Sequence, residues 1–176
     1  MKIYIDQSGK VEDTAKHTIL ACVNSEIKTI FLSAKDKRRL QEVFRRIGSP
    51  QLFVDYVFAA LLILLLKPLK ISKVTVDLEY PGHTKIISAL VTKEIELEID
   101  WKCIGKTSKA HDIAYKVFVG KLAIGKRSNT NEVFRVIKKI TGGYLKTGLS
   151  PVNRYSAPAN KRRIPNFKTK VKRNKK

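Results

Sequence analysis

Apolar and polar residues alternate at the start of the chain, where Ile3 and Ile5 precede Asp6. A period of two residues is typical of a β-strand, and Ser8-Gly9 marks a turn at its end. Asp6 is therefore expected where a strand passes into a loop, a position at which binding and catalytic groups are common. Taken alone, Asp6 also fits a structural role in which its carboxylate only binds the amides of the turn.

The same patterns predict the other elements. Alternation predicts strands at residues 1–9, 18–24, 28–32, 73–79 and 95–104, and helical spacing predicts helices at 33–47, 51–66, 85–92, 108–122 and 131–140. Ser33 is the expected cap of the first helix. The order predicts a mixed α/β domain at 1–149 whose first three strands are antiparallel and whose later strands are parallel.

Residues 51–66 form the most apolar stretch of the chain. A helix that is hydrophobic on nearly all sides is expected to be covered on most of them. Even taken from Leu52, the run is shorter than the ~18 residues that span a bilayer. The sequence therefore predicts a buried helix and no membrane segment.

The charge of the chain indicates the kind of partner that the protein binds. The 176 residues include 36 lysines and arginines against 15 acids, a net charge of +21. Residues 1–101 hold 15 basic and 13 acidic side chains, residues 102–149 hold 11 and 2, and residues 150–176 hold 10 and 0. This polarised excess predicts a polyanionic partner, and nucleic acid fits better than anionic membrane because the tail has no amphipathic helix. Residues 150–176 lack periodicity, and we expect them to form a disordered basic tail.

Cys22 and Cys103 stand in apolar, strand-like runs without paired spacing, so neither a disulfide framework nor a zinc site is implied. No signal-peptide pattern precedes the first strand. The expected location is a reducing cytoplasm.

The order of elements, with carboxylates at strand ends, resembles the ribonuclease H-like (retroviral-integrase-like) superfamily over roughly residues 1–122. That group includes ribonuclease H, Holliday-junction resolvases, Argonaute slicers and domains of unknown function that open with Tyr-Ile-Asp-Glu-Ser-Gly. Here the opening is Tyr-Ile-Asp-Gln-Ser-Gly at residues 4–9, which differs at one place. The resemblance implies a ribonuclease H-like mixed sheet flanked by helices.

It also implies a site. Asp6 would lie beside an acid at the end of the fourth strand, which is Asp77 by analogy with ribonuclease H or Glu79 by analogy with the resolvases. In the late helix, His111 aligns with the acidic position of the family, and Asp112 follows it. Argonaute-type enzymes use a His there, so both residues stay candidates. The resemblance thus implies catalytic roles for Asp6, Asp77, His111 and Asp112, and metal binding by Asp6, Asp77, Glu79 and Asp112.

The metal implied is Mg²⁺ or Mn²⁺, because two hard cations held by carboxylates activate a water and stabilise the leaving oxygen. The fourth ligand, usually a Glu of the first helix, is open between Glu42, Asp55 and none. Asp55 lies within the apolar helix and would need a partner or be neutral. Nucleic-acid contacts are assigned to Lys109, Lys116, Lys121, Lys126, Arg127, Lys161, Arg162 and Arg163. Resolvases of this fold act as dimers, so a homodimer is one expected assembly.

The sequence therefore favours a metal-dependent nuclease that hydrolyses phosphodiester bonds by a two-metal mechanism. A nucleic-acid-binding protein on the same scaffold with a decayed site is the first alternative, favoured by His111 and the missing early Glu of the first helix. A small basic RNA-binding or ribosome-associated protein is the second, favoured by the tail. RNA or DNA, and duplex, hybrid or junction, are left open as the substrate.

Overall fold

The computed structural model describes residues 3–143. Within this range lie six strands and five α-helices: β1 (Tyr4–Ser8), β2 (Thr18–Val23), β3 (Ile27–Leu32), α1 (Ala34–Arg46), α2 (Phe53–Leu66), β4 (Lys73–Asp77), α3 (Thr84–Thr92), β5 (Glu98–Lys102), α4 (Lys109–Phe118), β6 (Lys126–Ser128) and α5 (Thr130–Ile140). The predicted tail at 150–176, with Lys161, Arg162 and Arg163, lies outside the described residues.

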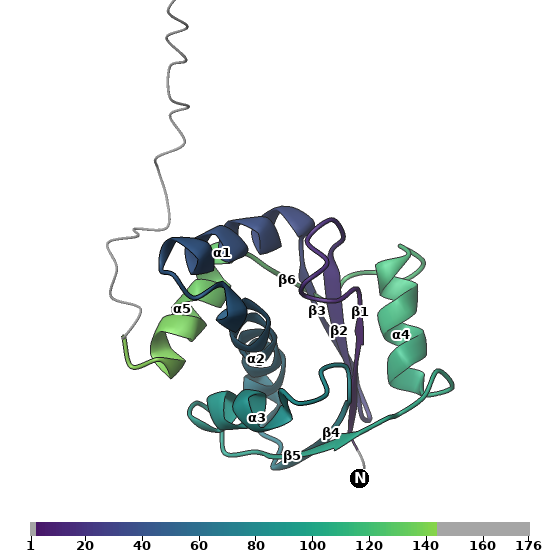
Figure 1. The fold of residues 1–176 in the computed structure, drawn as a ribbon. Coiled ribbons are helices and arrows are strands. Elements are labelled where there is room, and N and C mark those ends of the chain that lie inside the picture. Colours follow the sequence, from purple (N-terminus) through teal and green to yellow (C-terminus); the bar gives the residue numbers. More distant parts are fainter. Residues whose placement is uncertain (1–2, 144–176) are drawn as a thin grey trace, which may run out of the picture.

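The strands form one sheet in the order β5-β4-β1-β2-β3-β6 (Figure 1). β2 is antiparallel to both β1 and β3, whereas β4 is parallel to β1 and β5 is parallel to β4. The prediction of a mixed α/β domain with three antiparallel strands followed by parallel ones is confirmed. Strand β1 lies in the middle of the sheet, between β2 and β4. Because β1 and β4 are parallel neighbours, their carboxyl ends lie next to each other.

Strand β6 was not predicted. It has only three residues, of which Lys126 and Arg127 are exposed, so no alternation of apolar and polar residues marks it. It pairs in parallel with β3 and forms one edge of the sheet. The predicted strand at 95–104 is shorter in the structure, Glu98–Lys102, because the residues on either side extend beyond the ladder with β4.

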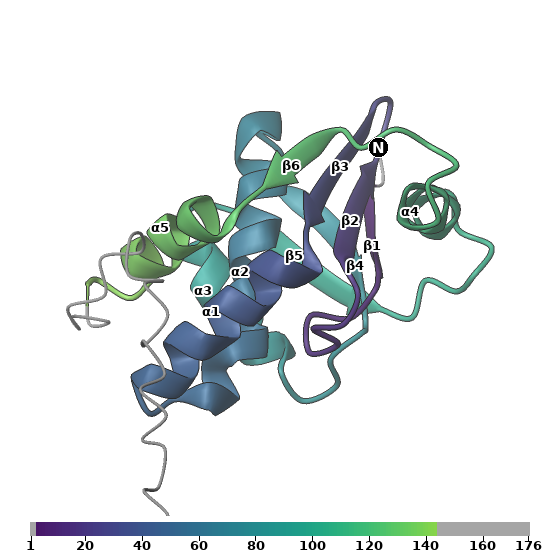
Figure 2. The same ribbon diagram turned by 90° about the horizontal axis from the view of Figure 1, so that it is seen from above.

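Helices cover the two faces of the sheet unequally. Figures 1 and 2 show α4 alone on one face and α1, α2, α3 and α5 on the other. The single helix α4 packs on β1 and β2 through Ala110, Ile113 and Ala114. On the opposite face Ile5 and Val76 join the larger core around α2. Alternate residues of β1 and β4 therefore face either the large core or the α4 side.

Helix α2 lies at the centre of the larger layer, in contact with α1, α3, α5, β2 and β3. With the short 3₁₀ turns at either end, the helical segment covers Pro50–Leu69 and is long and apolar enough to cross a membrane. Most of it is buried inside the fold, which is consistent with the core helix of a soluble protein. The predicted burial on most sides is confirmed.

Helix α1 begins as predicted, with the Ser33 hydroxyl accepting the amide N–H of Asp36 at 3.0 Å. One turn in, Lys37 is fully buried. Its Nζ donates to the carbonyls of Lys10 and Asp13, both at 2.7 Å, and to Thr18 Oγ1 at 2.9 Å. Burial lowers the pKa of Lys37 to about 8. This one amine therefore ties the loop between β1 and β2 to α1.

Replacing Lys37 with Met keeps the buried stem and removes the amine. We expect Lys37→Met to lower the free energy of unfolding by about 2–3 kcal/mol, because two backbone carbonyls and the buried Thr18 hydroxyl lose their donor. Urea denaturation measures the change. Lys35→Met, an exposed change two residues away on the same helix, should stay within about 0.5 kcal/mol of wild type. Equal effects of the two variants would contradict the tethering role.

Candidate metal centre

Pairing of β1 with β4 brings two aspartates together. The parallel register aligns Tyr4 with Thr75 and Ile5 with Val76, so the next pair along the strands is Asp6 and Asp77. Because Ile5 and Val76 point into the large core, the neighbouring Asp6 and Asp77 point to the α4 side of the sheet. The sequence prediction that these two residues come from adjacent strands agrees with this register.

Glu79 completes a group of three. After β4 the chain turns tightly, with the Glu79 amide donating to the carbonyl of Asp77 at 2.9 Å. Asp6, Asp77 and Glu79 each offer an oxygen within 4.8 Å of the others, and they are the one such acidic group among residues 3–143. Asp77 Oδ1 also accepts the amide N–H of Ile104 at 2.7 Å, which fixes the carboxylate from the loop after β5. We call these three residues the acidic cluster. It could hold a metal ion.

Asp6 is the buried member of the cluster, with only 2% of its surface exposed. Neither of its carboxylate oxygens has a hydrogen-bond partner among the described residues. Burial raises the pKa of Asp6, and the negative charge of Asp77 raises it further, while His111 opposes the rise. A buried carboxylate without hydrogen bonds is costly unless a nearby cation compensates it, and the His111 imidazole is the group that lies within ion-pair distance of Asp6. Asp6 therefore has the environment of a ligand more than of a structural residue.

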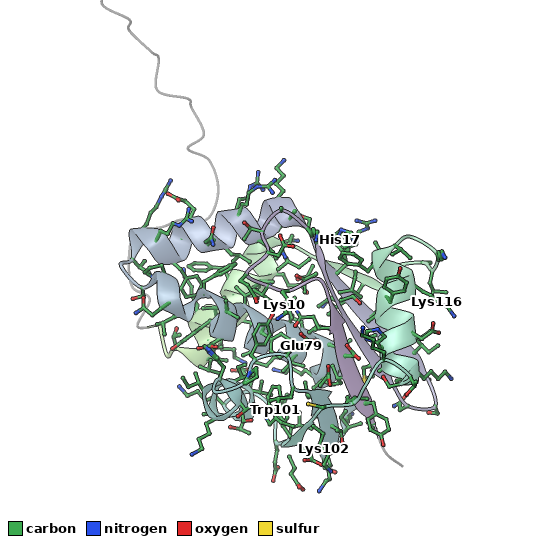
Figure 3. All side chains as sticks on the ribbon, turned by 45° about the vertical axis from the view of Figure 1, so that its right-hand side comes forward. Lys10, His17, Glu79, Trp101, Lys102 and Lys116 are labelled. Atoms are coloured by element: carbon green, nitrogen blue, oxygen red, sulfur yellow. The ribbon has the colours of Figure 1, made fainter. Side chains whose placement is uncertain are left out.

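Glu79 is half-buried, and its pKa is also raised, first by burial and then by the charge of Asp77. Lys10, in the loop after β1, partly offsets this rise with its positive charge. Figure 3 shows Lys10 and Glu79 near each other, at the end of the sheet. Sequence reasoning did not single out Lys10, because one lysine after a glycine turn carries no pattern.

His111 reaches the cluster from α4. The helix starts at Ser108, whose hydroxyl accepts the amide N–H of His111 at 3.0 Å. His111 Nδ1 lies 3.3 Å from Asp6 Oδ2, without the geometry of a hydrogen bond. Its side chain is 32% exposed, so the imidazole borders both the cluster and solvent. Of the two late-helix candidates, His111 is the one that the structure brings to Asp6.

The other predicted ligands have partners elsewhere. Asp112 is exposed and its carboxylate accepts from Lys116 Nζ at 2.7 Å, one turn along α4. Glu42 on α1 pairs with Arg46 at 2.9 Å. The structure places neither residue in the acidic cluster.

Asp55 is only 3% exposed, as its place in the apolar helix predicts. It has the partner that burial requires, since Asp55 Oδ1 lies 2.7 Å from His83 Nδ1. No pattern in the sequence indicates this pair, because His83 lies 28 residues further along the chain. Asp55 is not part of the acidic cluster.

The turn after β1 depends on Gly9. Its φ of +76° lies in the left-handed region, and a Cβ there would stand 2.2 Å from the carbonyl oxygen of His17. It would also meet the Phe118 ring at 2.7 Å. His17 Nε2 lies 2.9 Å from the carbonyl oxygen of Phe118, which joins the same loop to the end of α4. Only glycine permits this close approach.

A groove runs beside the cluster, between this loop and α4. Exposed Tyr115 lies one helical turn beyond His111 on α4. The groove is lined by Ser8, Gly9, Lys10, Glu12, Asp13, Lys16, Tyr115 and Phe118. Aromatic and charged groups of both signs therefore adjoin the acidic cluster.

The predicted nucleic-acid contacts within the described residues differ in their surroundings. Lys109 and Lys121 are exposed, whereas Lys116 is paired with Asp112 and Lys126 with Glu132 at 2.7 Å each. The Arg127 guanidinium lies 4.8 Å from the centre of the Phe31 ring. These residues come from α4, the loop after it and β6.

Comparison with known proteins adds no relative to these observations: no family model, curated protein or solved structure matches the chain.

The burial of Asp6 has a consequence for stability. In the folded state the pKa of Asp6 lies above its ordinary value. Below the pKa of the unfolded chain, this group therefore leaves the free energy of unfolding unchanged. As pH rises through the folded pKa, the free energy of unfolding falls. In metal-free buffer, we expect Asp6→Asn to raise the free energy of unfolding at pH 7 by about 1–2 kcal/mol. The gain should shrink as pH falls toward 4.

Chemical denaturation at several pH values measures this. Asp112→Asn is the control, because removing an exposed acid paired with Lys116 should cost about 0.3–0.5 kcal/mol at pH 7. If Asp6→Asn lowered the free energy of unfolding at pH 7, or raised it equally at every pH, the interpretation of Asp6 as a costly buried charge would be wrong.

Proposed function

We propose that this protein is a metal-dependent nuclease that hydrolyses phosphodiester bonds of a nucleic acid. The observation that carries the proposal is Asp6, a buried carboxylate with no hydrogen-bond partner among the described residues, next to Asp77 and Glu79. Such an arrangement of like charges fits a centre that a divalent cation completes. The excess of positive charge on the chain fits a polyanionic substrate.

The donor set fits Mg²⁺ or Mn²⁺. Asp6, Asp77 and Glu79 offer hard carboxylate oxygens, which these cations prefer. Asp6, Asp77 and Glu79 would hold the metal, with His111 at its border. When bound, divalent cations in such sites activate a water and stabilise the leaving oxygen of the phosphodiester.

The protein's own residues have separate roles in this proposal. The Ile104 amide holds the carboxylate of Asp77 in one orientation. Lys10, close to Glu79, would bind a phosphate oxygen of the substrate. The imidazole of His111, which borders both the cluster and solvent, would exchange a proton between the site and solvent. Tyr115, in the adjoining groove, offers a ring on which a base could stack.

The ribonuclease H-like fold is part of this proposal. It is supported by three antiparallel strands followed by parallel ones and by a first strand next to the fourth. It is supported further by the acids Asp6 and Asp77 on those two strands and by a late helix that brings His111 to Asp6.

A nucleic-acid-binding protein with a decayed site is the second candidate. It is favoured by the pairing of Asp112 with Lys116 and of Glu42 with Arg46, which leaves three carboxylates in the cluster. In that case the surface would bind nucleic acid without cleavage. In either case we propose a cytoplasmic location, to which the two free cysteines, Cys22 and Cys103, are suited.

Cleavage assays test the proposal. Labelled DNA duplex, RNA–DNA hybrid and four-way junction would each be incubated with Mg²⁺, Mn²⁺ or EDTA. We expect metal-dependent cleavage of one substrate by wild type, and a loss of at least about 100-fold in Asp6→Asn and Asp77→Asn because each removes a charged ligand. Glu26→Gln is the matched control, since Glu26 is exposed and pairs only with Lys28.

Cleavage that persists in Asp77→Asn, or that proceeds equally in EDTA, would contradict a metal-dependent site at the cluster. Tight binding of nucleic acid without cleavage in either metal would favour the second candidate.

A further inference from the structure

We propose that the exposed face of α1 binds the phosphate backbone of the nucleic acid, outside the acidic cluster. Cations recur on this face at helical spacing, and all five are exposed: Lys35, Arg38, Arg39, Arg45 and Arg46. We call them the α1 cationic face. With Thr14, Gln41 and Glu42 they line one shallow depression of the surface.

Most of this charge is not neutralised within the protein. Lys35, Arg39 and Arg45 form no ion pair with the described residues, and Arg38 donates to a neutral group, the carbonyl of Thr14, at 2.8 Å. Only Arg46 is paired, with Glu42.

The other acid of α1, Asp36, has its hydrogen-bond partners elsewhere, and of the five cations its charge interacts with that of Arg39. Its carboxylate accepts from the Thr130 amide at 3.1 Å and from the Thr130 hydroxyl at 2.7 Å. The α1 cationic face therefore carries a net positive charge that an anionic partner could neutralise.

Phosphate is the anion that these side chains fit best. Four of the five cations are arginines, whose planar guanidinium binds phosphate oxygens in a bidentate manner. At 1.5 Å per residue, the row from Lys35 to Arg46 is about 16 Å long, which suits several consecutive phosphates. A membrane surface fits less well, because the apolar residues Leu40 and Phe44 are fully buried and no apolar face of α1 is left to insert.

The α1 cationic face is coupled to the acidic cluster through one loop. Lys37 holds the carbonyls of Lys10 and Asp13, and Arg38 holds that of Thr14. The positive charge of Lys10 in turn acts on Glu79 of the acidic cluster and lowers the pKa of its carboxyl. Figures 1 and 3 show this loop between the start of α1 and the end of β1. A nucleic acid that crosses the loop would reach both surfaces.

The identity of the partner rests on the proposed function, but binding by α1 does not need catalysis. The test is therefore equilibrium binding of the full chain to a fluorescent 20-base-pair DNA duplex in EDTA, at several salt concentrations. The variant is Arg39→Gln/Arg45→Gln. Its control is Lys70→Gln/Lys85→Gln, which removes the same charge from exposed lysines outside α1. Lys85 lies on α3, which Figure 1 shows well apart from α1, and Lys70 precedes β4.

Each phosphate contact contributes about 0.9 to the slope of log affinity against log salt. We expect the α1 variant to reduce this slope by about 2 and to bind several-fold more weakly at every salt concentration, while the control keeps the wild-type slope. Equal slopes for the two variants would overturn the proposal. Binding to phosphatidylserine vesicles that depends on Arg39 and Arg45, with duplex binding unchanged, would overturn it in favour of a membrane contact.

Failure of this proposal can be told from failure of the proposed function. If wild type cleaves a substrate but the α1 variant keeps its slope, the nuclease stands and the α1 contact is wrong. If wild type never cleaves but the α1 variant loses slope, the α1 contact stands on a binding protein.

Discussion

The carboxylate of Asp6 is buried beside Asp77, and the proposed metal centre depends on this pair of like charges. Two parallel strands with a fixed register make the contact unavoidable, because Ile5 and Val76 occupy the large core and leave the next residues on the α4 side. Burial raises the pKa of Asp6, and the like charge of Asp77 raises it further. A cation at the cluster would relieve the repulsion. The surroundings of Asp6 are consistent with a site in which a bound cation offsets the free-energy cost of burying the carboxylate.

The loop between β1 and β2 is the second constraint, and it is held from both sides. Lys37 ties it to α1 with three hydrogen bonds from one buried amine. Gly9 and His17 bring it against Phe118 at the end of α4. The loop therefore connects the two helical layers at the end of the sheet where the acidic cluster lies. Such fixed support is what a site needs if its groups are to stay in place during binding.

Sequence patterns were sufficient for the elements that have a clear period. Alternation predicted the strands β1 and β4, and the resemblance to the ribonuclease H-like superfamily implied that Asp6 would lie beside Asp77 or Glu79. The parallel register of the two strands agrees with that expectation. The long apolar run predicted the buried helix α2, with Asp55 inside it. Strand β6 could not be predicted, because three residues with two exposed cations show no alternation, and pairing with β3 alone defines it.

Features that depend on tertiary contacts were not accessible from the sequence. A lysine in the first turn of a helix is usually solvated, so nothing in the sequence marks Lys37 as fully buried. The near-zero net charge of residues 1–101 hides the gathering of Arg38, Arg39 and Arg45 on one face of α1. The choice between His111 and Asp112 also needed the structure, because it depends on how α4 is rotated against β1.

The proposed nuclease activity depends on a cation at the acidic cluster, and crystals of the protein soaked in Mn²⁺ would test for that cation most directly. Anomalous diffraction at the manganese edge locates the ion without reference to activity. We expect a peak about 2.1 Å from carboxylate oxygens of Asp6 and Asp77, with Glu79 turned toward it. A structure with no peak at the cluster, in which Asp6 shares a proton directly with Asp77 or Glu79, would contradict the account.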